Sequence, residues 1–174
     1  MSALGLIDTD DDVAPCDWGT TLIVTVGNPS RGDDAVGPLL AERLSAWLDG
    51  EGCHHHWDLA IVSDQQLMVE HAYDLRWRDR VLFIDAAARQ SQPVQWRRIR
   101  AARSGPALSS HQCTPGQLLH LCAHTLKQRT PCAWLLSLRG ENFELGAPLS
   151  DAMQQAMTQA WPEILHWIAP PHHA

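Results

Sequence analysis

Two adjacent carboxylates follow a short apolar run near the start of the chain. Asp33 and Asp34 lie after a loop that begins at Gly27, where a helix is expected to start. Asp85 ends a second apolar run, and His111 precedes another expected helix. Carboxylate and imidazole groups bind borderline divalent metals, and three protein ligands leave positions open for substrate or water. The pattern therefore indicates a metal site formed by Asp34, Asp85 and His111.

The first loop has two other interpretations. A glycine loop before a helix N-terminus attracts phosphate, but the spacing of Gly27 and Gly32 lacks the dinucleotide fingerprint, and Asp33 and Asp34 would repel a phosphate. Alternatively, the two carboxylates cap the helix start and interact with its dipole. We expect that structural role for Asp33, with assistance as a base as a further hypothesis, and leave both roles open for Asp34.

The other reactive residues in the sequence indicate its function less clearly than these carboxylates do. The chain has no Gly-x-Ser-x-Gly elbow, no His-Glu-x-x-His helix and no cysteine in a protease motif. The run Cys53-His54-His55-His56 has the composition of a metal tract. It follows the first helix, away from the expected site, so we interpret it as a solvated loop.

Composition narrows the class of protein. With 174 residues, 45% of them hydrophobic, the chain fits one domain with its own core. Its 13 basic and 20 acidic residues give a net charge of −7, which argues against nucleic acid as a partner. We expect a flexible acidic leader over 1–19, a single α/β domain over 20–169 and a loose tail over 170–174.

The cellular location follows from what the sequence lacks. No apolar run approaches the roughly 18 residues needed to cross a bilayer, and the acidic N-terminus does not resemble a signal peptide. The five cysteines form no Cys-x-x-Cys pair, so we expect reduced thiols in a cytoplasmic protein that is a monomer when free.

Strands and helices are expected to alternate along the chain. Continuous apolar runs predict buried strands, Pro93 predicts that the fourth strand lies near an edge, and helical spacing predicts the helices. Ser63 and Asp64 are candidate caps of a short helix, and Thr114 with Gln117 forms a capping-box pattern. This order predicts an α/β/α sandwich with a mainly parallel sheet of about five strands. The expected strands are 22–26, 56–62, 81–84, 93–100 and 133–138.

Four motifs in order resemble the hydrogenase maturation endopeptidases, which remove the C-terminal extension of the large subunit of nickel-iron hydrogenases after nickel insertion. They are VGNPSRGDDAVGPLLAERL, LFIDAA around Asp85, SSHQCTPGQLLHL around His111, and LRGENFELGAPLS before the last helix. The resemblance covers about 21–168. Ala35 stands where family members often have glycine, and Ala86-Ala87-Ala88 replaces more varied residues, but neither difference affects a ligand.

The resemblance implies a function and a substrate. Asp34, Asp85 and His111 would be both the catalytic residues and the ligands that recognise nickel held by the hydrogenase large-subunit precursor. The fold it implies is the α/β/α sandwich that the periodicity predicts independently. Two alternatives stay open: a non-catalytic nickel-sensing chaperone of the same precursor, and a nucleotide-binding α/β protein. The sequence does not identify the hydrogenase, the scissile bond or the nucleophile.

Overall fold

The structure, a computed structural model, describes residues 19–50, 58–103 and 113–169. The tail 170–174, the His54–His56 run, His111 and all of the expected leader except Gly19 lie outside the described residues. The elements in chain order are β1 (Thr21–Val26), η1 (Gly32–Ala35), α1 (Val36–Asp49), β2 (Leu59–Asp64), η3 (Val69–Ala72), β3 (Arg80–Ala87), β4 (Val94–Ile99), α2 (Pro115–His124), β5 (Cys132–Arg139) and α3 (Asp151–Ile168).

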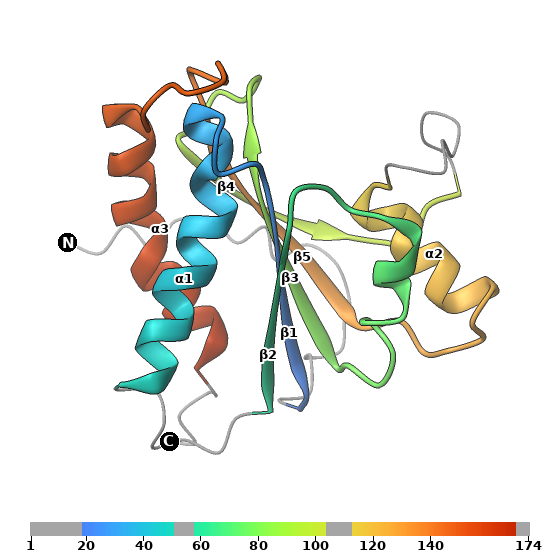
Figure 1. Cartoon of the computed structure of the whole chain (residues 1–174). Coiled ribbons are helices and arrows are strands. Elements are labelled where there is room, and N and C mark those ends of the chain that lie inside the picture. Colours follow the sequence, from blue (N-terminus) through green and yellow to red (C-terminus); the bar gives the residue numbers. More distant parts are fainter. Residues whose placement is uncertain (1–18, 51–57, 104–112, 170–174) are drawn as a thin grey trace.

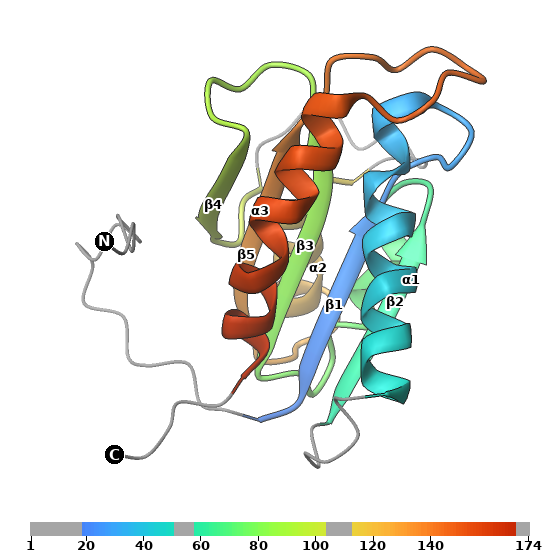
Figure 2. The ribbon, with the colours of Figure 1, turned by 90° about the vertical axis from the view of Figure 1, so that its left-hand side faces the viewer.

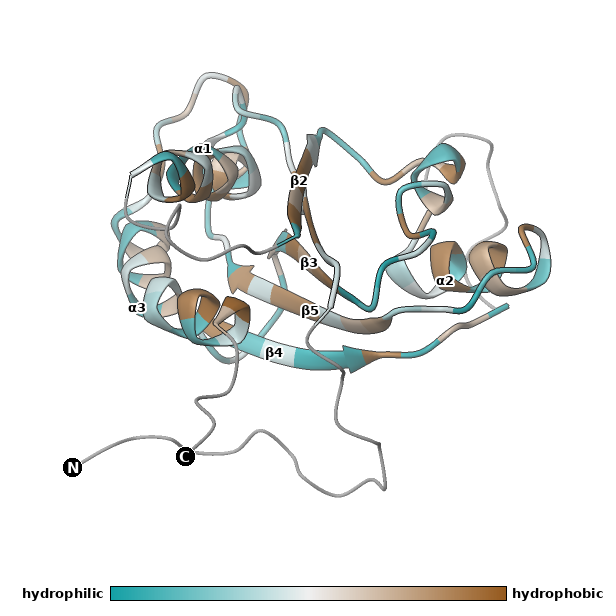
Figure 3. Cartoon of the chain, turned by 90° about the horizontal axis from the view of Figure 1, so that it is seen from below, coloured by the Kyte–Doolittle hydropathy of each residue, from teal (hydrophilic) through white to brown (hydrophobic). Residues whose placement is uncertain are grey.

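The five strands form one sheet in the order β2-β1-β3-β5-β4. The first four strands of that order pair in parallel, and β4 pairs antiparallel with β5. The predicted mainly parallel sheet is confirmed, and so is the edge position of the strand that follows Pro93. Figure 3 shows that β4 is largely hydrophilic, as expected for a strand with only one neighbour.

Two hydrophobic cores lie on opposite faces of the sheet. Helices α1 and α3 cover one face, and α2 with η3 covers the other, as Figures 1 and 2 show. Alternate residues of each strand enter alternate cores, because successive side chains of a strand point to opposite faces. In β3, Leu82 and Ile84 pack toward α1 and α3, whereas Val81 and Phe83 pack toward α2. The predicted three-layer sandwich is therefore confirmed.

Of the helix caps predicted at 63–64 and 114–117, one is confirmed and one is wrong. The capping box at α2 is confirmed, since Thr114 Oγ1 accepts from Gln117 N at 3.3 Å and Gln117 Oε1 accepts from Thr114 N at 2.8 Å. The prediction that Ser63 and Asp64 cap a helix is wrong, because both residues belong to β2. The short 3-10 helix that follows starts only at Val69, after Met68. Parallel pairing with β1 keeps these polar residues in the strand, which their side chains alone did not indicate.

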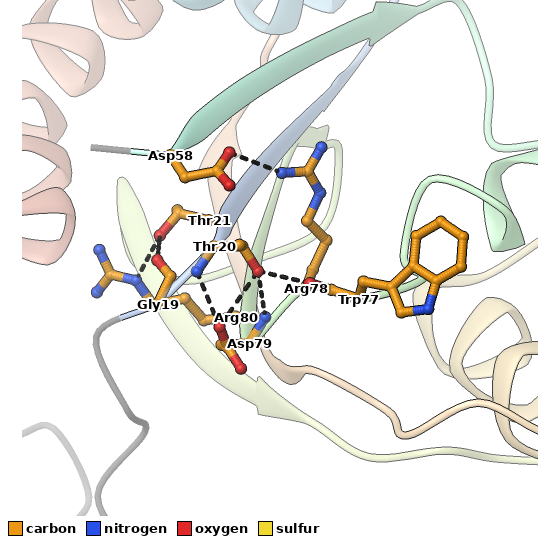
Figure 4. Close-up of polar contacts among 8 residues, drawn as sticks. All are labelled: Gly19, Thr20, Thr21, Asp58, Trp77, Arg78, Asp79 and Arg80. Carbon is orange, nitrogen blue, oxygen red and sulfur yellow. Dashed lines mark hydrogen bonds and ion pairs between the residues drawn. The ribbon is translucent and has the colours of Figure 1, made fainter. Parts of the chain in front are cut away.

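The amino edge of the sheet is fastened by polar contacts (Figure 4). Asp79 Oδ2 accepts from Thr20 N at 2.8 Å, which ties the start of β1 to the start of β3. The buried Arg80 guanidinium donates to Thr21 Oγ1 and to the carbonyl oxygens of Trp167 and Ile168 at 2.7–2.8 Å. Arg80 thereby binds the carbonyl end of α3, the negative end of the helix dipole, to the sheet.

The cysteines differ from the expectation of reduced thiols. Cys113 and Cys122 are free thiols, whereas Cys132 is disulfide-bonded. Spacing along the chain did not indicate this bond, because cysteine pairing depends on proximity in the fold. Among the described helices, none combines the length and the apolar character that a membrane crossing requires.

Candidate active site at the carboxyl edge of the sheet

The first loop places Asp34 beside the end of β1. Gly27 has a φ of +146°, and a Cβ there would collide with the carbonyl oxygen of Asp34, so the backbone closes tightly only with glycine. Asp34 lies in η1, and its Oδ2 accepts from Asn28 N at 3.0 Å. This bond fixes the carboxylate over the loop. Asp34 does not cap a helix, because neither η1 nor α1 has a side-chain cap.

Asp85 lies on the face of the sheet that α2 covers. It follows Val81 and Phe83 at intervals of two, and both of those side chains pack in the α2 core. Burial raises the pKa of Asp85 to about 6, partly offset by a hydrogen bond from the Ala86 backbone and increased by the negative charge of Asp34. The two predicted carboxylates are therefore close enough to interact, although they come from different elements.

Asp33 has a structural role that the sequence did not specify. Its side chain is completely buried, and Oδ2 accepts from Glu141 N, Asn142 N and Ser150 Oγ at 2.7–3.0 Å. Oδ1 accepts from Ser150 N at 2.8 Å. Burial alone would raise the pKa of Asp33, but these hydrogen bonds outweigh it and lower the pKa. The sequence predicted a structural role for Asp33, but the predicted role as a helix cap is wrong. Because these hydrogen-bond donors hold the carboxylate in place, Asp33 is not free to act as a base.

Asp64 is a further carboxylate at this edge that sequence reasoning assigned to a helix cap. Ala60 and Val62 pack in the α2 core, so Asp64 shares the face of Asp85. His71 Nδ1 lies 2.9 Å from Met68 N, and His71 Nε2 lies 3.5 Å from Asp64 Oδ2. The signal in the sequence is the one used for Asp85: an aspartate that ends an apolar strand.

His111 lies outside the described residues, but its neighbour Cys113 is placed. Cys113 N donates to the carbonyl oxygen of Leu67 at 2.8 Å, and Cys113 packs in the α2 core. Leu67 follows the end of β2 by three residues, so this contact lies near the carboxyl edge. Within the described ranges no three His, Cys, Asp or Glu side chains gather as a metal-binding group.

The donor set that is described fits a divalent cation. Two carboxylates that approach one another in a partly buried place repel, which is one reason that the pKa of Asp85 is high. A cation between them would remove that repulsion and displace the proton of Asp85. Asp34 and Asp85 are oxygen ligands, and a histidine on the segment before α2 would add the nitrogen ligand that nickel and zinc accept.

The fold is that of the [NiFe] hydrogenase maturation proteases. A maturation protease, HycI from Thermococcus kodakarensis KOD1, aligns with a TM-score of 0.64 at 19% identity, over 86% of this chain and 92% of that one. The hydrogenase maturating endopeptidase HybD from E. coli aligns with a TM-score of 0.63 at 19% identity, over 86% of this chain and 91% of that one. HybD from T. kodakarensis gives 0.58 at 18% identity, over 86% and 99%.

Sequence comparison, in contrast to structure comparison, finds no match. The chain matches no protein-family model and no curated protein sequence. The structural likeness at 18–19% identity defines the fold, and the chemistry has to be argued from the residues at the carboxyl edge.

Proposed function

We propose that this protein is an endopeptidase that removes the C-terminal extension of a nickel-iron hydrogenase large-subunit precursor in the cytoplasm. Nickel carried by the precursor is the recognition element, and Asp34, Asp85 and His111 are the residues that bind it and support cleavage. The protein is metal-dependent in this sense only: its metal arrives with its substrate.

The interaction between Asp34 and Asp85 carries this proposal. These carboxylates belong to separate elements, η1 and β3, and the fold brings them to one edge of the sheet. The raised pKa of Asp85, caused first by burial and also by the charge of Asp34, is typical of a functional carboxylate. Burial makes a charged Asp85 costly to the metal-free fold, and a neutral residue would avoid that cost.

The chain's own residues would act in distinct ways. Asp34, oriented by the Asn28 N–H, presents a fixed carboxylate. Asp85 has a pKa near 6 in the metal-free protein, so it would give up its proton on binding the cation and present a second carboxylate to it. When bound, a divalent cation supplies several kcal/mol of charge stabilisation to a developing oxyanion. Asp33 holds the adjoining loop and takes no part in the chemistry.

A processing assay tests the proposal. The purified protein is incubated with nickel-loaded precursor and, in parallel, with precursor that lacks nickel, and the masses are measured. Loss of a C-terminal peptide only from the nickel-loaded precursor is expected. Unchanged mass of the loaded precursor would contradict the protease assignment.

The second candidate is a nickel-sensing chaperone that binds the same precursor without cleaving it. The same carboxylates favour it, because binding a metal-loaded client needs no proton transfer. The two candidates separate in the same assay, since the chaperone would form a stable complex with a precursor of full length.

A further inference from the structure

Strand β2 forms an unprotected edge of the sheet. Of the five strands described, β2 and β4 have a single neighbouring strand each. Exposed edges invite pairing with another chain, and proteins usually protect them with proline and with charged side chains. Strand β4 has such protection, since it follows Pro93 and carries Arg97 and Arg98. Residues 59–62 of β2 are instead Leu-Ala-Ile-Val, all partly exposed, and Figure 3 shows the contrast in hydropathy between the two strands.

The backbone groups on the outer side of β2 have no partner in the described part of the chain. Strand β2 bonds to the β1 segment through alternate residues: the carbonyl oxygen of Asp58 accepts from Thr21 N at 2.7 Å, and that of Asp64 accepts from Gly27 N at 3.1 Å. Backbone groups of successive strand residues point to opposite sides, so the N–H and C=O groups of residues 59, 61 and 63 point away from β1. No described residue forms a hydrogen bond with them.

The chemistry of this row of groups selects an extended polypeptide as its partner. Donors and acceptors that alternate at strand spacing match the backbone of one further strand, whose hydrogen bonds supply affinity while alternate side chains supply specificity. The side chains of Leu59 and Ile61 pack toward the core of α1 and α3, and those of Ala60 and Val62 pack toward the core of α2. An added strand with apolar side chains would therefore extend both cores.

Strand β2 ends beside the candidate site. Gly27, which bonds to the last residue of β2, begins the loop in which Asn28 N donates to Asp34 Oδ2. A strand added beside β2 would lie two strand spacings, about 10 Å, from the end of β1. An extended chain crosses that distance with about three residues. A polypeptide held at Asp34 can therefore reach the outer side of β2 within a few residues.

We propose that the C-terminal tail of the client polypeptide binds as an added strand on the outer side of β2, antiparallel to it. The inference rests on the proposed function and deepens it, because it names the conformation in which the tail is recognised. Strand β2 runs toward the carboxyl edge of the sheet, whereas a tail that starts at the reacting carboxylates runs away from that edge, so the pair is antiparallel. Since β2 has six residues, about six tail residues pair with it, beginning about three residues after the scissile bond.

A proline scan of the precursor tail tests this inference without altering the enzyme. About nine residues after the scissile bond are replaced singly by proline, and steady-state kinetics of tail removal are measured with nickel-loaded precursor. Proline removes one backbone N–H, and in an antiparallel pair every second residue exchanges hydrogen bonds with its partner. Every second proline in the paired stretch is therefore expected to raise KM about fivefold with kcat unchanged, and the intervening prolines much less. Alanine at the same positions is the control for loss of the side chain.

Ile61→Pro tests the same contact from the enzyme. The N–H of Ile61 points outward, so proline removes a donor to the tail and no bond to β1, and KM should rise about fivefold with kcat unchanged. Arg98→Pro is the matched control at the other edge. Because Arg139 N donates to Pro93 O, the same alternation points the N–H of Arg98 away from β5, and both constants should stay parental. Thermal unfolding checks that both variants fold, and the tail scan decides if Ile61→Pro does not.

The remaining outcomes separate this inference from the proposed function. A tail scan without a two-residue period in KM would overturn the added strand while the protease assignment stands. If the parental protein binds the loaded precursor without cutting it, the protease assignment fails, and the same scan measured as Kd then tests the added strand. If light scattering shows a parental dimer that Ile61→Pro dissociates, the edge pairs with a second copy and the inference is wrong.

Discussion

Asp33 and Ser150 are joined by two hydrogen bonds across 117 positions of the sequence, from Ser150 N to Oδ1 and from Ser150 Oγ to Oδ2. The same hydroxyl oxygen accepts from Met153 N at 3.1 Å and so caps α3. One buried carboxylate thereby orders the first loop, the segment 140–149 between β5 and α3, and the start of the last helix.

Replacing Asp33 with Ala should therefore lower the free energy of unfolding severely, by about 3 to 5 kcal/mol, because buried donors lose a charged acceptor. Urea unfolding measures the loss. Asp34→Asn is the neighbouring comparison: it removes the charge but keeps an oxygen that can accept from Asn28 N, so we expect stability within about 1 kcal/mol of the parent and no tail removal. Equal losses of stability for the two variants would contradict the division of roles.

The lowered pKa of Asp33 also gives a pH dependence. Hydrogen bonds to its charged form hold the folded pKa below the unfolded value, so this stabilisation is complete above roughly pH 4 and is lost as pH falls through the folded pKa. Acid unfolding of the parental protein should show this loss below about pH 4. The profile of Asp33→Asn should be flatter over that range, and an identical profile would contradict the assignment.

The pKa of Asp85 should make stability depend on pH in the opposite direction to that of Asp33. Its folded pKa, about 6, lies above its ordinary value of 3.8, so the metal-free fold loses stability as pH rises from about 4 to 6. Asp85→Asn removes that penalty and should stabilise the protein by about 2 to 3 kcal/mol at pH 8, with little effect at pH 4, while tail removal is abolished. Thermal unfolding at the two pH values measures the difference, and equal gains at both would refute it.

His111→Ala should abolish tail removal and leave the fold intact, because the imidazole is the expected third ligand of the nickel that the precursor carries. Circular dichroism and the melting temperature check the fold, and mass spectrometry checks processing. The exposed His124 on α2 provides the control, since His124→Ala should process at the parental rate. Parental processing by His111→Ala would remove this residue from the site.

Thr25→Val should stabilise the protein by about 1 kcal/mol. The Thr25 side chain is fully buried in β1, and its hydroxyl is the one buried side-chain polar atom without a hydrogen-bond partner among the residues described. Valine has the same shape and favours strands, so the change removes an unsatisfied group at no packing cost. An increase of about 2–4 °C in melting temperature is expected, and a decrease would show that the hydroxyl is satisfied.

The sequence predicts the sheet and its layers well because apolar periodicity reports burial directly. The run 81–84 is buried on both faces, and Thr114 with Gln117 carries its own start signal for α2. The predicted helix-cap roles of Asp33 and Asp64 were wrong because burial periodicity carries no information about polar partners. Their partners, Ser150 and His71, are chosen by tertiary packing, which local pattern does not encode. The approach of Asp34 to Asp85 followed from topology, since parallel strands end at one edge.

The anchoring of α3 by Arg80 links the two ends of the last helix to different parts of the fold. Arg80 joins the carbonyl end of α3 to the start of β1, and Ser150, which caps the other end, is bound to Asp33 beside the candidate site. Local unfolding of α3 should therefore also release the loop that carries Asp34, so we expect the last helix and the candidate site to open as one cooperative unit.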